Sequence, residues 1–234
     1  MFSQTMRFAF RFLFVCAAFA FVGRAHAEVP RGFVPLFNGK DLSGWKGLID
    51  PRKRASLTPE ELKEAQVQAD RRMREHWHVE NGELVFDGEG DSLCTEKDYA
   101  DFELLVDWRI ESGGDSGIYL RGVPQVQIWD TEHKPYFQYG SRKGSGALWN
   151  NQIHARFPLE KADKPVGQWN TFLIRMVGDR VSTNLNGKLV VDDVVLENYW
   201  ERESPVPDKG SIELQSHKTK LWFRNLYIRE LKHE

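Results

Sequence analysis

Two neighbouring strand-like runs, residues 117–121 and 125–130, carry side chains that could recognise a sugar. Side chains alternate between the faces of a strand, so one face of these runs is apolar and the other polar. The polar set is Tyr119, Arg121, Gln125, Gln127 and Trp129, with Asp130 at the strand end. These groups combine planar hydrogen-bonding side chains with aromatic rings, which suits carbohydrate. The alternative is an ordinary solvated sheet face, which usually carries Lys and Glu; neither occurs in residues 115–130.

A second polar run, near the end of the chain, adds a group that can exchange a proton. Glu213, Gln215 and His217 alternate with other residues, so His217 continues one polar face. Histidine is the side chain that titrates most readily near neutral pH. Two interpretations of His217 stay open: a catalytic group, or a histidine at the solvent edge of a sheet.

The spacing of Gln125, Gln127 and Asp130 is similar to the Glu-x-Asp-x-x-Glu strand of jelly-roll glycanases, with two carboxylates replaced by amides. An amide cannot serve as a carboxylate nucleophile or a titrating acid, which argues against direct retaining hydrolysis. The sequence also contains no serine-nucleophile elbow, paired-cysteine zinc spacing, phosphate-binding loop or dinucleotide fingerprint.

The elements that would position these residues are short strands separated by turn signals. Asn81-Gly82 and Asn186-Gly187 suit type I′ hairpin turns, and residues 171–191 predict a three-strand meander. Residues 102–110 form the longest strand candidate, with Glu103 and Asp107 on one face. Strands at this spacing without alternating helices predict an all-β fold, an antiparallel β-sandwich.

One helix and one long loop interrupt the strands. Thr58-Pro59-Glu60-Glu61 combines a capping box with proline at the first helical position, and apolar residues then recur at helical spacing up to Trp77. We expect a surface helix that covers an edge of the sandwich. Residues 131–165 are irregular and rich in Gly, Lys, Asn and aromatic residues, and we expect them to wall the site.

The start of the chain predicts export. Residues 1–27 contain three arginines and no acid, an apolar run over residues 12–22, and Ala25-His26-Ala27 before Glu28. This pattern is typical of a signal peptide cleaved after Ala27, so we expect a periplasmic or secreted protein with one domain over residues 28–234. Removal of residues 1–27 leaves 207 residues and changes the formal charge from −2 to −5. That charge argues against nucleic-acid partners, and no later run is long and apolar enough for stable membrane insertion.

Several blocks of the sequence resemble the 3-keto-disaccharide hydrolase family, formerly a domain of unknown function. The blocks are FVPLFNGKDLSGW at residues 33–45, residues 93–108, 115–130 and 210–231, and Gly167-Gln168-Trp169-Asn170. The resemblance spans nearly the whole chain after residue 27 in the family's order. It implies a concanavalin-like jelly roll that acts on glycosides already oxidised at C3: the glycosidic bond breaks by elimination, and water adds to the resulting 2-hydroxy-glucal. Gln125 departs from the pattern, because other members often carry Glu there.

This chemistry needs a base near C2, a group that stabilises the enediolate at the C3 oxygen, and an acid for the leaving oxygen. The candidates are Arg121 for the enediolate, His217 or Asp107 for the base, and Asp130 for the acid. The candidate substrate contacts are Tyr119, Gln125, Gln127, Trp129, Gln215 and Glu103. A divalent metal ion chelated by the enediolate could replace part of the role of Arg121.

Two rival functions remain at this point. The domain could be a carbohydrate-binding module without catalysis, because one fold serves both purposes. It could also be an ordinary glycosidase that acts on unoxidised sugar with Glu103, Asp107 or Asp130.

Overall fold

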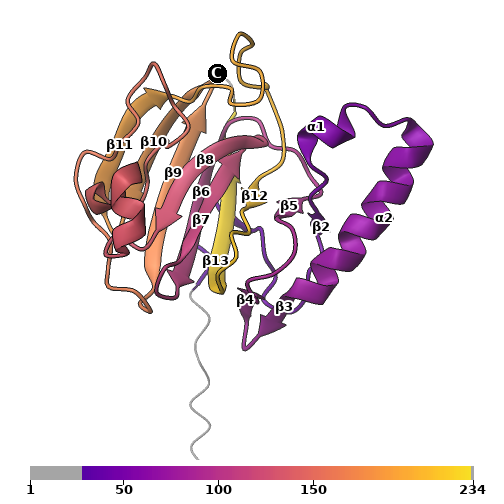
Figure 1. The fold of residues 1–234 in the computed structure, drawn as a ribbon, viewed down its shortest axis with the longest axis horizontal. Coiled ribbons are helices and arrows are strands. Elements are labelled where there is room, and N and C mark those ends of the chain that lie inside the picture. The colour runs from indigo at the N-terminus through magenta and orange to yellow at the C-terminus, as the bar shows by residue number, and fades with distance from the viewer. Residues whose placement is uncertain (1–27, 233–234) are drawn as a thin grey trace, which may run out of the picture.

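The computed structural model describes residues 28–232, which form two antiparallel β-sheets packed face to face (Figure 1). The larger sheet has the order β11-β10-β9-β6-β13-β4-β3, and β1 also pairs with β13. Its strands are β1 (Val34–Pro35), β3 (Trp77–Glu80), β4 (Glu83–Phe86), β6 (Phe102–Ile110), β9 (Asn170–Val177), β10 (Arg180–Leu185), β11 (Lys188–Val195) and β13 (Leu221–Glu230). The expected all-β jelly roll is confirmed. The expected signal peptide lies outside the described residues.

The smaller sheet has the order β2-β5-β12-β7-β8 and carries the polar face singled out in the sequence. Its strands are β2 (Trp45–Gly47), β5 (Leu93–Thr95), β12 (Glu213–Leu214), β7 (Asp115–Leu120) and β8 (Val123–Trp129). Strands β7 and β8 are consecutive in the chain, whereas β12 arrives from almost a hundred residues further on. The face therefore depends on long-range pairing as well as on the local hairpin.

The core lies between the two sheets and follows from strand alternation. Along β6 the residues are alternately buried and half-buried, from Phe102 to Ile110, as the sequence pattern predicts. Inward-facing Trp108 packs on Phe172 of β9 with their ring centroids 5.4 Å apart. Burial of each such side chain contributes about 1.5–3 kcal/mol to stability, and the alanine variant of Phe172 would cost about 3–5 kcal/mol.

Two hairpins use the predicted Asn-Gly turns. Asn81 and Gly82 have φ of 52° and 79°, and Asn186 and Gly187 have φ of 53° and 84°. Positive φ at both central residues is the type I′ geometry that matches strand twist. The second turn joins β10 to β11, which completes the expected β9-β10-β11 meander.

Helix α2 (Pro59–His76) covers the open edge of the smaller sheet, as expected (Figure 1). The Thr58–Glu61 capping box starts the helix. Its side chains provide hydrogen-bond partners for backbone groups of the edge strand β2. Asp70 Oδ1 accepts from Gly47 N at 3.0 Å, and Gln66 Nε2 donates to Gly47 O at 2.9 Å. A Cβ on Gly47 would lie 2.1 Å from Ala69 O, so only glycine permits this approach. The contact closes an edge that would otherwise be open to pairing with another strand.

Three shorter helical segments were not expected from the sequence. Helix α1 (Pro51–Arg54) follows β2, and the 3₁₀ helices η1 (Lys134–Tyr139) and η2 (Ser141–Lys143) lie in the long loop after β8. Neither α-helix within residues 28–232 has the length and apolar character that crossing a membrane would require.

Candidate functional site

The outward face of the smaller sheet forms the floor of a hollow of about 600 Å³, here called the aromatic hollow. Residues paired across strands point to the same side, and Asp115 pairs with Trp129, Gly117 with Gln127, and Tyr119 with Glu213. The floor and near walls consist of Asp115, Tyr119, Gln125, Gln127, Trp129, Gln215 and His217. Six of these seven were candidates from the sequence, and Asp115 was not.

A chain of amide hydrogen bonds runs along the floor towards Asp115. Gln125 Nε2 donates to Gln127 Oε1 at 2.7 Å, and Gln127 Nε2 donates to Asp115 Oδ1 at 2.7 Å. The carbonyls of Ser116 and Ile128 also accept from Gln127 Nε2 and fix its orientation. Gln127 is only 2% exposed, so this network lies in a low-dielectric region where aligned hydrogen bonds reinforce one another.

Gly117 makes room for this chain. A Cβ at Gly117 would lie 2.0 Å from Gln125 Oε1, so the close approach of the Gln125 side chain requires glycine on β7. Gln125 Oε1 is buried and has no hydrogen-bond partner among the described residues. Gln215 Oε1 is in the same condition. Both side chains line the hollow, so a hydroxyl-bearing ligand could satisfy these two acceptors.

Asp115 also faces His217, which lies nearer the mouth of the hollow. The Asp115 Oδ2 to His217 Nδ1 distance is 3.6 Å, and the side chains are 18% and 50% exposed. Burial raises the pKa of Asp115, whereas His217 and the hydrogen bond from Gln127 act in the opposite direction. The distance exceeds that of a formed hydrogen bond, but such contacts often tighten when substrate binds.

Tyr119 is held so that its hydroxyl hydrogen is free to point elsewhere. Gln215 Nε2 donates to Tyr119 Oη at 3.2 Å, which occupies an acceptor position and leaves the O–H available as a donor. Burial raises the pKa of Tyr119 above its ordinary value, which keeps the phenol protonated. This donor lies on the floor of the hollow between the amides and Glu213.

Aromatic rings form the walls. The expected contribution of residues 131–165 is observed: η1 and the following loop supply Tyr136, Tyr139 and Trp149. Trp149 meets Trp129 and Tyr139 edge-to-face, with ring centroids 6.5 and 6.3 Å apart. Trp129 Nε1 donates to Gly144 O at 2.9 Å, which ties β8 to the same loop.

The opposite wall comes from parts of the chain that the sequence analysis did not select. Tyr199 and Trp200 precede the loop that leads to β12, and Arg52 belongs to α1. Trp200 Nε1 donates to Gly122 O at 2.8 Å, and the Arg52 guanidinium lies 5.9 Å from the centroid of the Trp200 ring. An adjacent Tyr-Trp pair in an otherwise polar segment was the available clue.

Arg121 does not reach the aromatic hollow. It follows β7 at a φ of 55°, so strand alternation no longer decides its direction. Its guanidinium is 3% exposed and forms an ion pair with Asp101 at 2.6 Å. It also donates to Ala100 O and Pro207 O. The expectation that Arg121 shares a face with Gln127 is therefore corrected: Arg121 joins the β7–β8 turn to two neighbouring loops.

Asp130 also has a structural place. Its carboxylate accepts from the backbone N–H groups of Gly113 at 2.8 Å and Glu132 at 2.9 Å, at the start of the long loop. The residue is 4% exposed and does not line the aromatic hollow. Asp130 therefore stabilises the backbone where β8 ends and the long loop begins. It lies outside the aromatic hollow, so it is not placed to act as the expected leaving-group acid.

Asp107 and Glu103 lie on the opposite surface of the sandwich. Both belong to β6 in the larger sheet, and alternation directs them away from the core that separates the two sheets. Asp107 accepts from Thr171 Oγ1 at 2.6 Å and Asn225 Nδ2 at 2.8 Å, whereas Glu103 pairs with Arg229. The structure thus does not bring either carboxylate to the candidate site.

The aromatic hollow offers only part of a ligand set for the divalent metal ion considered from the sequence. Within residues 28–232, no group of three or more His, Cys, Asp and Glu side chains is arranged to hold a metal ion. Asp115 and His217 supply two such groups. No step proposed below passes through a metal.

Comparisons with known proteins agree with this architecture. A 3-keto-disaccharide hydrolase from Bacteroides thetaiotaomicron is 22% identical over an alignment covering 86% of this chain and 79% of the relative. Two solved structures from Parabacteroides distasonis, provisionally assigned as glycosyl hydrolases, share the fold. One has a TM-score of 0.63 at 24% identity, covering 86% of this chain and 84% of that chain. The other has a TM-score of 0.62 at 23% identity, covering 86% and 95%.

The comparison that decides the family is with a domain model rather than with one relative. The model of the 3-keto-alpha-glucoside-1,2-lyase-like domain matches residues 32–229, which include every strand of both sheets except the last residue of β13. The chain therefore belongs to the family of 3-keto-alpha-glucoside-1,2-lyase-like domains.

Proposed function

We propose that this protein is a carbohydrate-active enzyme that cleaves glycosides oxidised at C3, by elimination followed by addition of water. The observation that carries the proposal is the Asp115–His217 pair at the end of the buried amide chain, in the aromatic hollow. Family membership and the 3-keto-disaccharide hydrolase relative support the substrate class.

In the proposed first step, His217 removes the proton from C2 of the sugar. A ketone at C3 makes this proton acidic, because the electron pair of the broken C–H bond delocalises onto the C3 oxygen. Asp115 orients the imidazole and stabilises the imidazolium that forms, as the carboxylate does in other Asp–His pairs. The Tyr119 O–H and the Arg52 guanidinium, which also pairs with Asp50, both line the hollow and are the donors that we assign to the enediolate oxygen.

In the second step the enediolate collapses. The C3 ketone re-forms, a double bond forms between C1 and C2, and the C1–oxygen bond breaks. The leaving oxygen takes the proton held by His217, which returns to its neutral form. A water molecule then adds its hydroxyl to C1 and its hydrogen to C2, so the net reaction is hydrolysis.

Binding of the sugar would use the groups left unsatisfied in the hollow. The buried Oε1 atoms of Gln125 and Gln215 can accept hydrogen bonds from sugar hydroxyls. Trp129, Trp149 and Trp200 offer aromatic surface for the sugar ring. These features also suit a carbohydrate-binding module, which is the second candidate function.

An ordinary glycosidase is less well supported. That chemistry needs two carboxylates on either side of the bond. Asp115 is the sole carboxylate among the described residues that line the aromatic hollow.

The decisive experiment incubates purified protein with a methyl 3-keto-glucoside and with its unoxidised parent, with and without a chelator. We expect release of 3-keto-glucose from the first substrate only, and exchange of the C2 hydrogen with deuterated solvent. Binding of oligosaccharides without any product would favour a binding module. Sugar release from the unoxidised parent would favour an ordinary glycosidase.

We further propose that the enzyme acts outside the cytoplasm, after cleavage behind Ala27. Mass spectrometry of the protein recovered from the periplasm or medium should give an N-terminus at Glu28. Recovery of the uncleaved chain in the cytoplasm alone would refute this location.

A further inference from the structure

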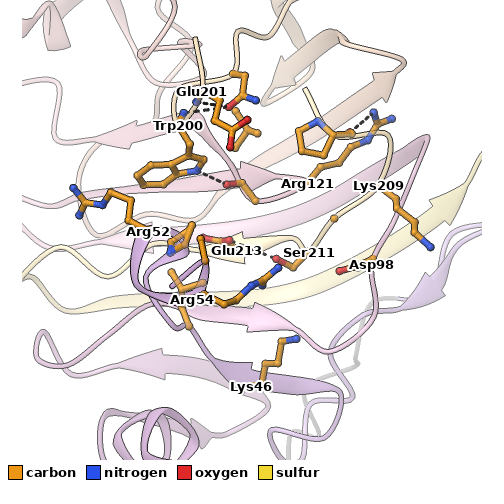
Figure 2. A pocket seen from close by; sticks show the side chains of 18 residues that line it. Lys46, Arg52, Arg54, Asp98, Arg121, Trp200, Glu201, Lys209, Ser211 and Glu213 are labelled. Carbon is orange, nitrogen blue, oxygen red and sulfur yellow. Dashed lines mark hydrogen bonds between the residues drawn. The ribbon is translucent and has the colours of Figure 1, made fainter. Parts of the chain in front are cut away.

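A second hollow of about 510 Å³ lies beside the aromatic hollow on the same sheet (Figure 2). Arg52 and Trp200 line both hollows, so the two form neighbouring parts of one surface depression. The side chains that matter here are Lys46, Arg52, Arg54, Trp200, Lys209 and Glu213. Apart from these two shared residues, no group that lines the second hollow has a role in the chemistry proposed above.

Glu213 is the unexplained group in this hollow. It faces outward from β12, paired across strands with Tyr119 of β7, and is 2% exposed. Its Oε1 has a long hydrogen bond of 3.4 Å from Ser211 Oγ, and its Oε2 has no hydrogen-bond partner among the described residues. A buried carboxyl oxygen without a partner costs stability, so it requires an explanation, and a ligand that binds it is one.

The protonation state of Glu213 suits a neutral partner. Burial raises the pKa of Glu213 to about 7, against smaller lowering effects from Ser211, Arg54 and Lys46. In the protonated form the carboxyl group both donates and accepts a hydrogen bond, as a sugar hydroxyl does. A ligand with hydroxyl groups can therefore complement Glu213 without bringing a second charge into a buried position.

The rim carries charges of both signs. Lys46, Arg52, Arg54 and Lys209 supply cations, of which Arg52 is paired with Asp50, and Asp98 and Glu201 supply anions. In Figure 2 the Trp200 ring and Glu213 both border this space, with Arg54 below them. Donors, acceptors and an aromatic ring around one depression match an uncharged, hydroxyl-rich group better than a strongly charged one.

We infer that the second hollow is a subsite for the leaving part of the substrate, a second sugar residue, and that Glu213 binds one of its hydroxyl groups. This inference rests on the function proposed above. The spacing is compatible with it: Glu213 and His217 are four residues apart, at most about 14 Å of extended chain. Two linked sugar rings can span that distance, with Trp200 at the junction between the hollows.

The test compares two substrates that differ only in the leaving group, a 3-keto-disaccharide and a methyl 3-keto-glucoside. Glu213→Leu removes the hydrogen-bonding group and keeps a similar volume, whereas Glu213→Gln keeps both the shape and the ability to donate and accept. Glu203→Gln, at an exposed position outside the hollow, is the control. We measure kcat/KM of each variant on each substrate.

We expect Glu213→Leu to lower the disaccharide-to-methyl ratio of kcat/KM by roughly tenfold, chiefly through KM, as loss of one hydrogen bond predicts. Glu213→Gln should restore most of that ratio, and Glu203→Gln should match the wild type. Equal losses on both substrates, or no loss on either, would overturn the subsite while leaving the proposed function intact.

A binding measurement covers the case in which the wild type cleaves neither substrate. The indole N–H resonance of Trp200, assigned with Trp200→Phe, is followed while unoxidised glucose is added. A saturable shift that Glu213→Leu weakens at least fivefold would support a sugar site here even without the proposed reaction. Absence of a saturable shift in the wild type, together with absent turnover, would reject the subsite.

Discussion

Gln127 and Asp115 are joined side chain to side chain: the amide nitrogen of Gln127 donates to Asp115 Oδ1 over 2.7 Å. Gln127 stands on β8 and Asp115 begins β7, so the bond crosses the hairpin diagonally on the outward face. The amide keeps Asp115 hydrogen-bonded without adding charge. This relationship explains why an amide is useful at a position where the jelly-roll glycanase pattern has a carboxylate.

We predict that Gln127→Glu destabilises the protein in a pH-dependent manner. Two carboxylates in contact cannot both be ionised, so one of them keeps its proton and has a raised pKa. A raised pKa in the folded state means that the stability is present at low pH and lost as the pH rises through that pKa. Urea denaturation should show a loss of about 2 kcal/mol or more at pH 8 and a smaller loss at pH 5.

Gln138→Glu provides the control, because Gln138 is exposed on η1. It should change the free energy of unfolding by less than about 0.5 kcal/mol at either pH. Equal stability of Gln127→Glu and the wild type at pH 8 would contradict the expected repulsion between residue 127 and the half-buried Asp115.

The Asp115–His217 pair leads to a prediction about non-additive kinetics. His217→Ala should lower kcat on a methyl 3-keto-glucoside by about 10²-fold or more, because the proton acceptor is removed. Asp115→Asn should also lower kcat, but the double variant should lose no more than His217→Ala alone, since Asp115 acts through His217. Multiplicative losses would show that the two residues act independently.

His78→Ala is the matched histidine control for these measurements. His78 pairs with Glu80 on β3, where both side chains are exposed. Its kcat should equal that of the wild type. Circular dichroism and the Tm of each variant show whether any lost activity reflects lost structure.

Tyr119→Phe tests the proposed donor to the enediolate. Loss of the hydroxyl should lower kcat by roughly 10²-fold and change KM less, because the hydrogen bond strengthens only as negative charge develops. Tyr136→Phe is the comparison, since the Tyr136 hydroxyl already donates to Gly113 O at 3.0 Å. Similar losses in the two variants would remove the special role assigned to Tyr119.

The face of β7 and β8 could be predicted from the sequence because strand alternation is local. Tyr119, Gln125, Gln127 and Trp129 follow it and meet in the hollow, and the continuing polar run placed Gln215 and His217 correctly. Asp115 was not among the candidates, although it lies within residues 115–130. Its value as a site residue depends on the position of His217, which arrives about a hundred residues later.

The positions of several site candidates could not be predicted from strand alternation alone. Arg121 comes one residue after β7 in a left-handed conformation, which redirects its side chain. Asp107 and Glu103 alternate as predicted, but the sequence does not reveal which sheet β6 joins. Arg52 and Trp200 belong to segments whose place is decided by packing, so periodicity could not assign them.

Arg121 should therefore behave as a structural residue. Arg121→Ala removes the cationic partner of buried Asp101 and three hydrogen bonds, which should lower the free energy of unfolding by about 3–5 kcal/mol. For the folded fraction, kcat on a methyl 3-keto-glucoside should stay close to the wild-type value. Full stability combined with a large loss of kcat would instead restore Arg121 as a catalytic group.

The exposed pair of Arg180 and Asp193 provides the control. Their side chains are 49% and 60% exposed. Surface ion pairs of this kind contribute little, so Arg180→Ala should cost less than about 1 kcal/mol. If both arginine variants lost a comparable free energy of unfolding, burial of the Arg121–Asp101 pair would not be the reason for the loss in Arg121→Ala.

Glu213 should make the stability of the folded protein depend on pH. Its pKa is raised to about 7 by burial at a position that is 2% exposed. The folded state therefore holds this proton more tightly than the unfolded chain, where the pKa of glutamate is about 4.3. The contribution to the free energy of unfolding is fully present below pH 4.3 and is lost as the pH rises to about 7, a change of roughly 3–4 kcal/mol.

Glu213→Gln isolates this effect, because the amide has a similar shape and does not titrate. Burial also raises the pKa of Asp115 and Asp163, which gives the same sign of pH dependence in both proteins and cancels in the difference. Urea denaturation between pH 4.5 and 8 should show wild-type stability falling relative to Glu213→Gln across this range. Parallel curves would mean that Glu213 is as accessible to water in the folded protein as in the unfolded chain, which would also weaken its assignment as a buried contact for a sugar hydroxyl.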